Sequence, residues 1–132
     1  MKSVYKLLLQ DELLAVSRFP SQSPYPEWAQ GESIVALVRT PEEITIVCAE
    51  KFVPPGVKAE PGWRAFQVEG PLAFNQVGVL ASLASPLAEA GAGIFVISTF
   101  STDYLFVKAT QLEQAITALQ KAGHTIIQEN HP

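Results

Sequence analysis

The sequence contains little cysteine, little histidine and no cluster of positive charge. Among its 132 residues there is one cysteine, Cys48, so an internal disulfide is excluded, and with two histidines a Cys/His zinc site is excluded as well. Nine Lys and Arg against thirteen Asp and Glu give a net charge of −4. A nucleic-acid binder normally shows a basic face. We therefore expect no nucleic-acid partner, no polybasic membrane patch and no metal site.

Long apolar runs are also missing. No run reaches the roughly 18 residues that a membrane helix needs, and residues 4–9 are too short and too interrupted for the apolar region of a secretory signal. Apolar residues nevertheless make up 48% of the chain and charged residues 17%, which is enough for a core and argues against disorder. We therefore expect a soluble, cytoplasmic protein of one ordinary domain or two small ones.

Two proline-rich segments divide the chain. Residues 51–62 contain three prolines and two glycines, and because proline restricts its own φ and biases the residue before it, this segment is predicted to be a linker. Residues 19–31 form a second such loop. The chain is therefore predicted to consist of an N-terminal unit with its linker, residues 1–62, and a C-terminal unit, residues 63–132. Neither half alone would bury much surface, so we expect the halves to pack together.

The second half begins with a strand and a helix. Residues 63–69 alternate in the way typical of a strand. Residues 76–90 carry apolar side chains at helical spacing, with Asn75 as a candidate N-cap and Gly91 at the end. Pro86 lies inside this pattern and is expected to kink or loosen the helix, because proline lacks the backbone N–H.

The remainder predicts a hairpin, a second helix and a last strand. Residues 94–100 are β-branched and aromatic with apolar side chains on both faces, which predicts a central strand, and residues 104–108 form its hairpin partner. Thr110–Glu113 has the pattern of a capping box that begins a helix. Residues 124–128 predict the final strand. The order βαββαβ is the ferredoxin-like arrangement, in which two helices cover one face of a four-stranded antiparallel sheet.

The first half reads as a degraded copy of the second. Its apolar segments predict four strands, at residues 4–9, 13–17, 33–39 and 44–49. The first of the two helices has no full counterpart, and the proline-rich loop that contains Trp28 is expected to take its place. The predicted fold class is therefore α+β: two tandem ferredoxin-like units, antiparallel sheets with helices on one face, and a degraded first unit.

Two segments resemble a known family. The run IFVISTFSTDYLFV, residues 94–107, is similar to the ACT domains of bacterial proteins related to the CASTOR arginine sensors, and SIVALVRTPEEITIV, residues 33–47, resembles the preceding ACT-like unit. The resemblance covers nearly the whole chain, and the ISTFSTDY hairpin is its most specific part. It implies a regulatory module that binds amino acids or other small ligands, usually where two such domains pair.

The resemblance also implies where a ligand would bind, near the start of the first helix and the Thr-Phe…Asp hairpin. The residues that match these positions are Thr99, Phe100 and Asp103 in the hairpin, with Gln76, Val77 and Gly78 at the helix entry. The resemblance does not carry over the identity of the ligand.

The chemistry of an amino-acid ligand agrees with these residue types. A helix N-terminus offers free N–H groups and positive potential to a carboxylate, and Gly78 allows close approach. Asp103 offers a charged partner to an ammonium or a basic side chain, Thr99 a hydroxyl and Phe100 an apolar wall. Each also has an ordinary interpretation: Asp103 as a turn residue, Gly78 as relief of helix packing, and Thr99 and Phe100 as strand residues.

Catalysis has little support in the sequence. No Cys/His or Ser/His pair is close along the chain, and Gly91-Ala92-Gly93 follows a helix instead of leading into one, so it is not a phosphate loop. We expect a non-catalytic, amino-acid-binding regulatory module without cofactor that forms a homodimer, since C2 dimers are the commonest oligomers. The alternatives are a ligand-free dimerisation or interaction scaffold and, third, a small enzyme.

Overall fold

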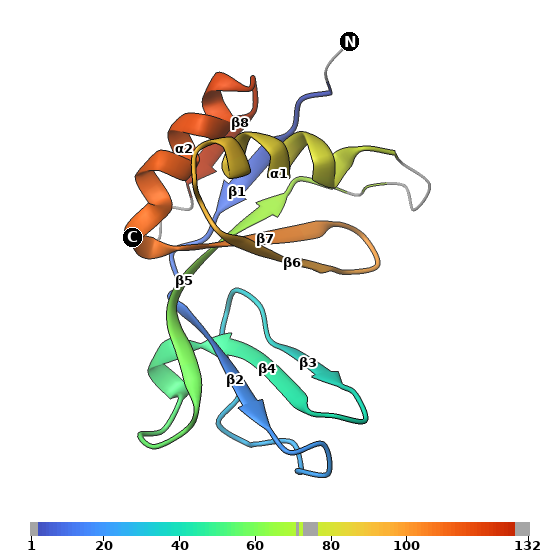
Figure 1. The fold of residues 1–132 in the computed structure, drawn as a ribbon, viewed down its shortest axis with the longest axis vertical. Coiled ribbons are helices and arrows are strands. Elements are labelled where there is room, and N and C mark those ends of the chain that lie inside the picture. Colours follow the sequence, from blue (N-terminus) through green and yellow to red (C-terminus); the bar gives the residue numbers. More distant parts are fainter. Residues whose placement is uncertain (1–2, 71, 73–76, 129–132) are drawn as a thin grey trace. The chain divides into compact units, whose positions relative to one another are not determined.

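The computed structural model describes residues 3–70, 72 and 77–128 (Figure 1). The chain divides into two compact units. The strand unit runs from Glu12 to Trp63, and the helical unit contains the segment up to Asp11 together with the chain from Arg64 onward. No helix of the described residues is long and apolar enough to cross a membrane.

The helical unit is a mixed sheet with two helices on one face. Its sheet has the order β8-β1-β5-β7-β6, in which β1 runs parallel to β8 and antiparallel to β5, and β6 antiparallel to β7. The elements in chain order are β1 (Lys6–Leu9), β5 (Ala59–Val68), α1 (Val79–Glu89), β6 (Ile94–Ser98), β7 (Asp103–Lys108), α2 (Leu112–Lys121) and β8 (Thr125–Gln128).

The N-terminal strand β1 packs in the helical unit. The sequence placed it in a unit of residues 1–62, but it pairs with β5 on one side and with β8 on the other. Its Leu7 and Leu9 are buried in the core of this unit. The sheet of the helical unit therefore includes a strand from the opposite end of the chain. Local periodicity does not reveal such a long-range pairing.

The core of the helical unit lies between the sheet and the helices, which cover the same face (Figure 1). Leu83 and Leu87 of α1 are fully buried there, as is Leu119 of α2. Each such leucine contributes about 1.5–3 kcal/mol of burial free energy. Because strand residues alternate, Leu105 and Val107 of β7 point to this face, and Phe106 points to the other.

Helix α1 is shorter than predicted and accommodates its proline. It begins after Gly78, which has φ +82° and serves as N-cap without a side-chain cap, whereas the predicted cap Asn75 lies outside the described residues. Pro86 leaves the carbonyl of Ser82 without its helical donor. The Nε2 of His124 lies 3.1 Å from this carbonyl, and Nδ1 accepts the N–H of Tyr5 at 3.1 Å. Since Nδ1 is the acceptor, the proton resides on Nε2, and His124 replaces the missing bond.

Two local predictions for the helical unit are wrong. The expected capping box at Thr110–Glu113 does not form: a 3₁₀ turn, η2 (Ala109–Gln111), precedes α2, and the N-cap Gln111 makes no side-chain cap bond. The side chain of Gln111 bonds instead to Gly91 and Gly93. Strand β6 is also not central, because in the described chain it pairs with β7 alone and is partly exposed.

The strand unit has the sheet order β3-β4-β2-β5, all antiparallel, and contains no α-helix in residues 12–63. Its elements are β2 (Leu14–Phe19), β3 (Ala36–Arg39), β4 (Ile44–Ala49), the 3₁₀ turn η1 (Glu50–Phe52) and the first part of β5.

The core of the strand unit is covered by the proline-rich loop. Ile44, Ile46 and Cys48 of β4 are buried, and Trp28 packs against them. The ring of Trp28 also lies 5.9 Å from that of Phe19. The loop around Trp28 therefore contributes to the core of this unit, in which residues 12–63 form no α-helix.

The last residues of the predicted linker, residues 51–62, belong to a strand. Strand β5 begins at Ala59 and pairs with β2, with a register shift between the pairs Trp63–Leu14 and Glu60–Val16. Gly62 lies at this bulge with φ +82°, a conformation that favours glycine. Its N–H donates to Glu50 Oε1 at 2.7 Å. The glycine that suggested a loop is thus a bulge inside a strand.

Candidate functional site

The β6–β7 hairpin ends in a tight turn at the residues with the most specific family resemblance. The N–H and the hydroxyl of Thr99 both donate to the carbonyl of Thr102, at 2.8 and 3.1 Å, and the N–H of Thr102 lies 3.2 Å from the Thr99 hydroxyl oxygen. Phe100 stands at the tip and is 82% exposed. The hydroxyl of Thr99 thus closes the turn.

Hydrogen bonds tie this turn to the segment that leads into α1. The hydroxyl of Thr102, a residue that is 6% exposed, donates to the carbonyl of Val68 at 2.5 Å, and the N–H of Leu72 donates to the carbonyl of Ser101 at 2.7 Å. Between them, a Cβ on Gly70 would lie 3.1 Å from that carbonyl oxygen and 3.3 Å from the Cβ of Thr102. This close approach holds the turn against the end of β5.

The entry of α1 has backbone donors without an intrahelical acceptor. The N–H of Ser82 makes the first helical bond, to Gly78, so the N–H groups of the preceding residues have no intrahelical acceptor. No side-chain cap and no acidic first-turn residue occur in the described part of this helix. Val77 is 91% exposed, and Gln76 lies outside the described residues. The helix end therefore presents positive potential to an anion.

Asp103 lies on the same sheet face as the helices. It pairs with Ser98 in the hairpin register, and alternation places both on the side of Leu105 and Val107. Asp103 is half-buried, and its Oδ1 accepts the hydroxyl of Ser98 at 2.6 Å. Alternation assigns Thr99 to the opposite face.

Topology brings the hairpin turn and the start of α1 to one end of the sheet. Strand β5 ends beside the turn, since Val68 bonds to Thr102, and α1 then runs back over the sheet to the start of β6. Figure 1 shows both at the same end of the helical unit. A carboxylate and a helix N-terminus thus lie at one end of the sheet and on one face.

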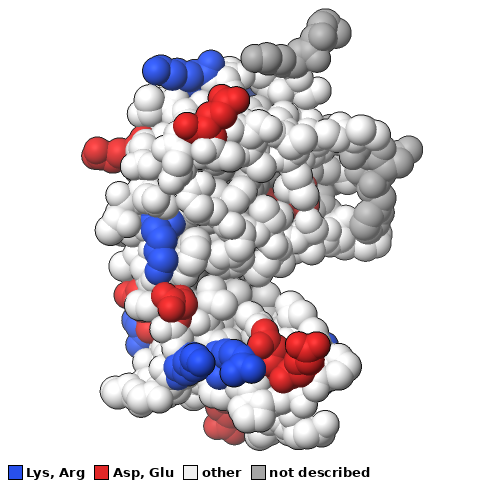
Figure 2. Space-filling model, viewed as in Figure 1, with Lys and Arg blue, Asp and Glu red and all other residues white. Residues whose placement is uncertain are grey.

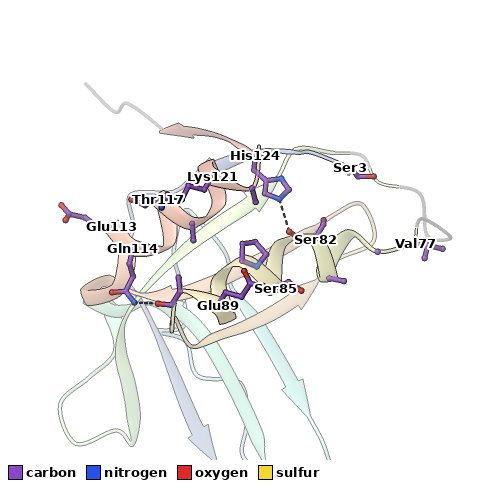
Figure 3. Close-up of a pocket in the computed structure, with 16 residues that line it drawn as sticks. Ser3, Val77, Ser82, Ser85, Glu89, Glu113, Gln114, Thr117, Lys121 and His124 are labelled. Carbon is purple, nitrogen blue, oxygen red and sulfur yellow. Dashed lines mark hydrogen bonds between the residues drawn. The ribbon is translucent and has the colours of Figure 1, made fainter. Parts of the chain in front are cut away.

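A separate groove of about 1100 Å³ lies between α1 and α2 (Figure 3). Val77 and Gly78 line it, whereas Thr99, Phe100 and Asp103 do not. Two of its polar side chains bond within the protein: His124, which is 4% exposed, bonds through both ring nitrogens, and Gln114 Nε2 donates to the carbonyl of Ala90 at 3.1 Å. The sequence prediction missed this groove, although the small residues of α1 were a signal for it.

The described residues offer little for other chemistry. Burial raises the pKa of the Cys48 thiol, which disfavours a nucleophilic thiolate. Across residues 3–70, 72 and 77–128 no group of three His, Cys, Asp or Glu could hold a metal ion. On the face in Figure 2 basic side chains lie singly, in a pair or beside acidic ones.

The sequence and fold are those of an ACT-domain protein. A family model described as "ACT domain" matches residues 58–121, and a model of an N-terminal domain matches residues 12–56. A protein from Agrobacterium tumefaciens with a crystal structure is 37% identical, with a TM-score of 0.92 over 98% of this chain and 97% of that chain. The regulatory subunit of aspartate kinase from Thermus thermophilus, 14% identical, shares the fold with a TM-score of 0.62 over 92% of this chain and 99% of that chain.

A second comparison gives a more specific sequence similarity. The cytosolic arginine sensor for mTORC1 subunit 1 of Homo sapiens is 37% identical over 60 residues, which are 45% of this chain and 18% of that protein. The match thus spans less than a fifth of the relative's length. The chain therefore contains an ACT domain and is related in sequence to the cytosolic arginine sensors, as the ISTFSTDY motif predicted.

Proposed function

We propose that the chain is a non-catalytic regulatory module that binds an amino acid where α1 begins beside the β6–β7 hairpin. The observation that carries this proposal is the position of Asp103, on the helix-bearing face and at the end of the sheet where α1 opens. An α-amino acid has a carboxylate and an ammonium one carbon apart. The helix N-terminus is suited to the first and Asp103 to the second.

The remaining predicted residues have distinct roles in this proposal. Gly78 and Val77 lie at the entry that receives the carboxylate, and Gln76, which is outside the described residues, is part of the proposed site. Phe100, exposed at the tip, supplies an apolar wall. Thr99 acts through the turn, because its hydroxyl is bonded to Thr102.

The relatives support a sensing role in a regulatory protein. One is named a cytosolic arginine sensor, and another is the regulatory subunit of aspartate kinase. Binding would change a population of arrangements only as far as the affinities for them differ. A cytoplasmic location and two tandem ACT-like units, the strand unit being the degraded one, belong to the same proposal.

Association of two chains is part of the proposal. In the described chain β6 pairs on one side alone, and an edge strand of this kind is suited to pairing with a second copy. A two-fold pair is the commonest arrangement.

Thermal unfolding against the twenty standard amino acids tests the proposed site. A ligand at about 100 times its Kd adds about 2.7 kcal/mol, a midpoint shift of several degrees for a chain of this size. We expect one or two amino acids to produce the shift, with its loss in Asp103→Ala and its retention in Glu89→Ala. Glu89 is the matched control, because it is an exposed acid that lines the groove instead.

Other outcomes would favour other functions. A shift that is lost in Glu89→Ala and kept in Asp103→Ala would move the ligand to the groove between α1 and α2. No shift with any amino acid at millimolar concentration would favour the scaffold. The open groove and the edge strand β6 are the features that such a scaffold would use.

A further inference from the structure

The carboxylate of Asp103 is oriented by a residue outside the predicted site. Ser98, the last residue of β6, donates its hydroxyl to Asp103 Oδ1 at 2.6 Å. The two residues are directly opposite in the hairpin register, where Cβ atoms come within about 4.5–5.5 Å of each other. The hydroxyl of a serine at this position can therefore reach the carboxylate of Asp103 from ordinary strand backbone.

Hydrogen bonds in and beside the turn stabilise the hairpin that carries Ser98 and Asp103. Beyond Asp103 the turn is closed by Thr99 and Thr102, and Thr102 is anchored to the carbonyl of Val68. The backbone of Ser98 and Asp103 is paired in the ladder beside this turn, and the side chain of Asp103 has several staggered rotamers. The bond from Ser98 selects one of them.

We infer that Ser98 is a positioning residue for ligand binding, which holds Asp103 Oδ1 so that Oδ2 is presented to the cationic group of the bound amino acid. The inference rests on the proposed function. A carboxylate accepts several donors at once, so the bond to Ser98 leaves capacity for the ligand. A group already held in its binding rotamer loses less conformational entropy when the ligand arrives. Ser98 thus acts on affinity through Asp103.

The test compares three variants of the full chain by thermal unfolding against the twenty standard amino acids, followed by titration with the one that gives the largest shift. We expect Ser98→Ala to raise the Kd about tenfold and to leave the midpoint of the unliganded protein unchanged, because Ser98 is exposed. Ser98→Thr keeps a hydroxyl in a strand and should restore the affinity. Ser101→Ala is the matched control, since in this structure Ser101 bonds through its backbone carbonyl.

Each contrary result overturns the inference in a recognisable way. Wild-type affinity in Ser98→Ala, or an equal loss in Ser101→Ala, would remove the positioning role and leave the proposed function intact. A lower unliganded midpoint in Ser98→Ala, with no rescue by Ser98→Thr, would make its role structural. If no amino acid shifts the unfolding midpoint of the wild-type chain, the proposed function is overturned, and with it the role of Ser98.

Discussion

The helical unit contains a mixed sheet and the strand unit an antiparallel one, and different structures cover the apolar face of each. In the helical unit the cover is two amphipathic helices, whose Leu83, Leu87 and Leu119 are fully buried. In the strand unit the cover is a proline-rich loop with Trp28. Where the proline-rich segment forms no helix, the large aromatic side chain of Trp28 contributes to the cover instead.

The two units also differ in how they satisfy polar groups. In the helical unit a buried histidine, His124, satisfies the carbonyl that Pro86 leaves free and the N–H of Tyr5. In the strand unit the notable ionic contact is at the surface, where Arg18 Nε donates to Glu43 Oε1 at 2.7 Å. Buried bonds of the first kind are costly to lose, whereas exposed ion pairs contribute little.

The largest predicted loss of stability comes from truncating a side chain that covers the apolar face of each sheet. Leu83→Ala should lower the free energy of unfolding by about 2–5 kcal/mol, because it opens a cavity in a fully packed core. Trp28→Ala should cost less, about 2 kcal/mol, since Trp28 is only half-buried. Urea unfolding gives the magnitudes.

Hydrogen exchange then localises the two losses. We expect faster exchange in β4 for Trp28→Ala and in α1 and α2 for Leu83→Ala. An equal increase throughout the chain in both variants would show that the two units unfold as one.

The next effect concerns His124 and Pro86. His124→Ala should cost about 1–3 kcal/mol, because it leaves the Ser82 carbonyl and the Tyr5 N–H without these partners. Pro86→Ala restores a backbone N–H that can donate to the same carbonyl. In that background the cost of His124→Ala should shrink by about 1 kcal/mol.

A double-mutant cycle by urea unfolding measures this coupling. Strict additivity of the two substitutions would mean that His124 does not compensate for the proline. The cycle is informative because residues 86 and 124 are 38 positions apart, counted from their residue numbers, and in Pro86→Ala the restored backbone N–H and His124 Nε2 compete for the Ser82 carbonyl.

Features that depend on neighbouring residues agree between the sequence prediction and the structure, whereas features that depend on distant residues do not. Strand β4 was predicted at residues 44–49 and occurs there, because six consecutive β-branched and apolar residues decide it. The position of β1 was missed, since its partners β5 and β8 lie 57 or more residues away in sequence and no local pattern names them. The edge position of β6 was missed for the same reason.

The candidate site shows the same limit. The motif named the hairpin and the helix entry, which lie at one end of the helical unit (Figure 1), but the faces of individual residues required the register. Ser98 and Asp103 pair across the hairpin, so Thr99 lies on the other face. The local sequence also does not show that His124 is buried: β8 returns beside β1, and the N–H of Tyr5 donates to the His124 ring there.

The smallest predicted effect is the pH dependence of the surface ion pair in the strand unit. The hydrogen bond from Arg18 lowers the pKa of Glu43 below its ordinary value of 4.5. Near pH 4.5 the unfolded chain then binds more protons at this residue than the folded chain, so the ion pair stabilises the fold above that pH. The contribution disappears as the pH falls through the lowered pKa of the folded state.

Urea unfolding of Glu43→Gln at several pH values checks this sign. The stability difference between wild type and Glu43→Gln should be largest near neutral pH, shrink below pH 4.5 and become smaller with added salt, because the pair is exposed and screened. Glu42→Gln is the matched control on the same turn. A pH-dependent difference of the same size in Glu42→Gln would assign the effect to the net charge of the turn and not to the contact with Arg18.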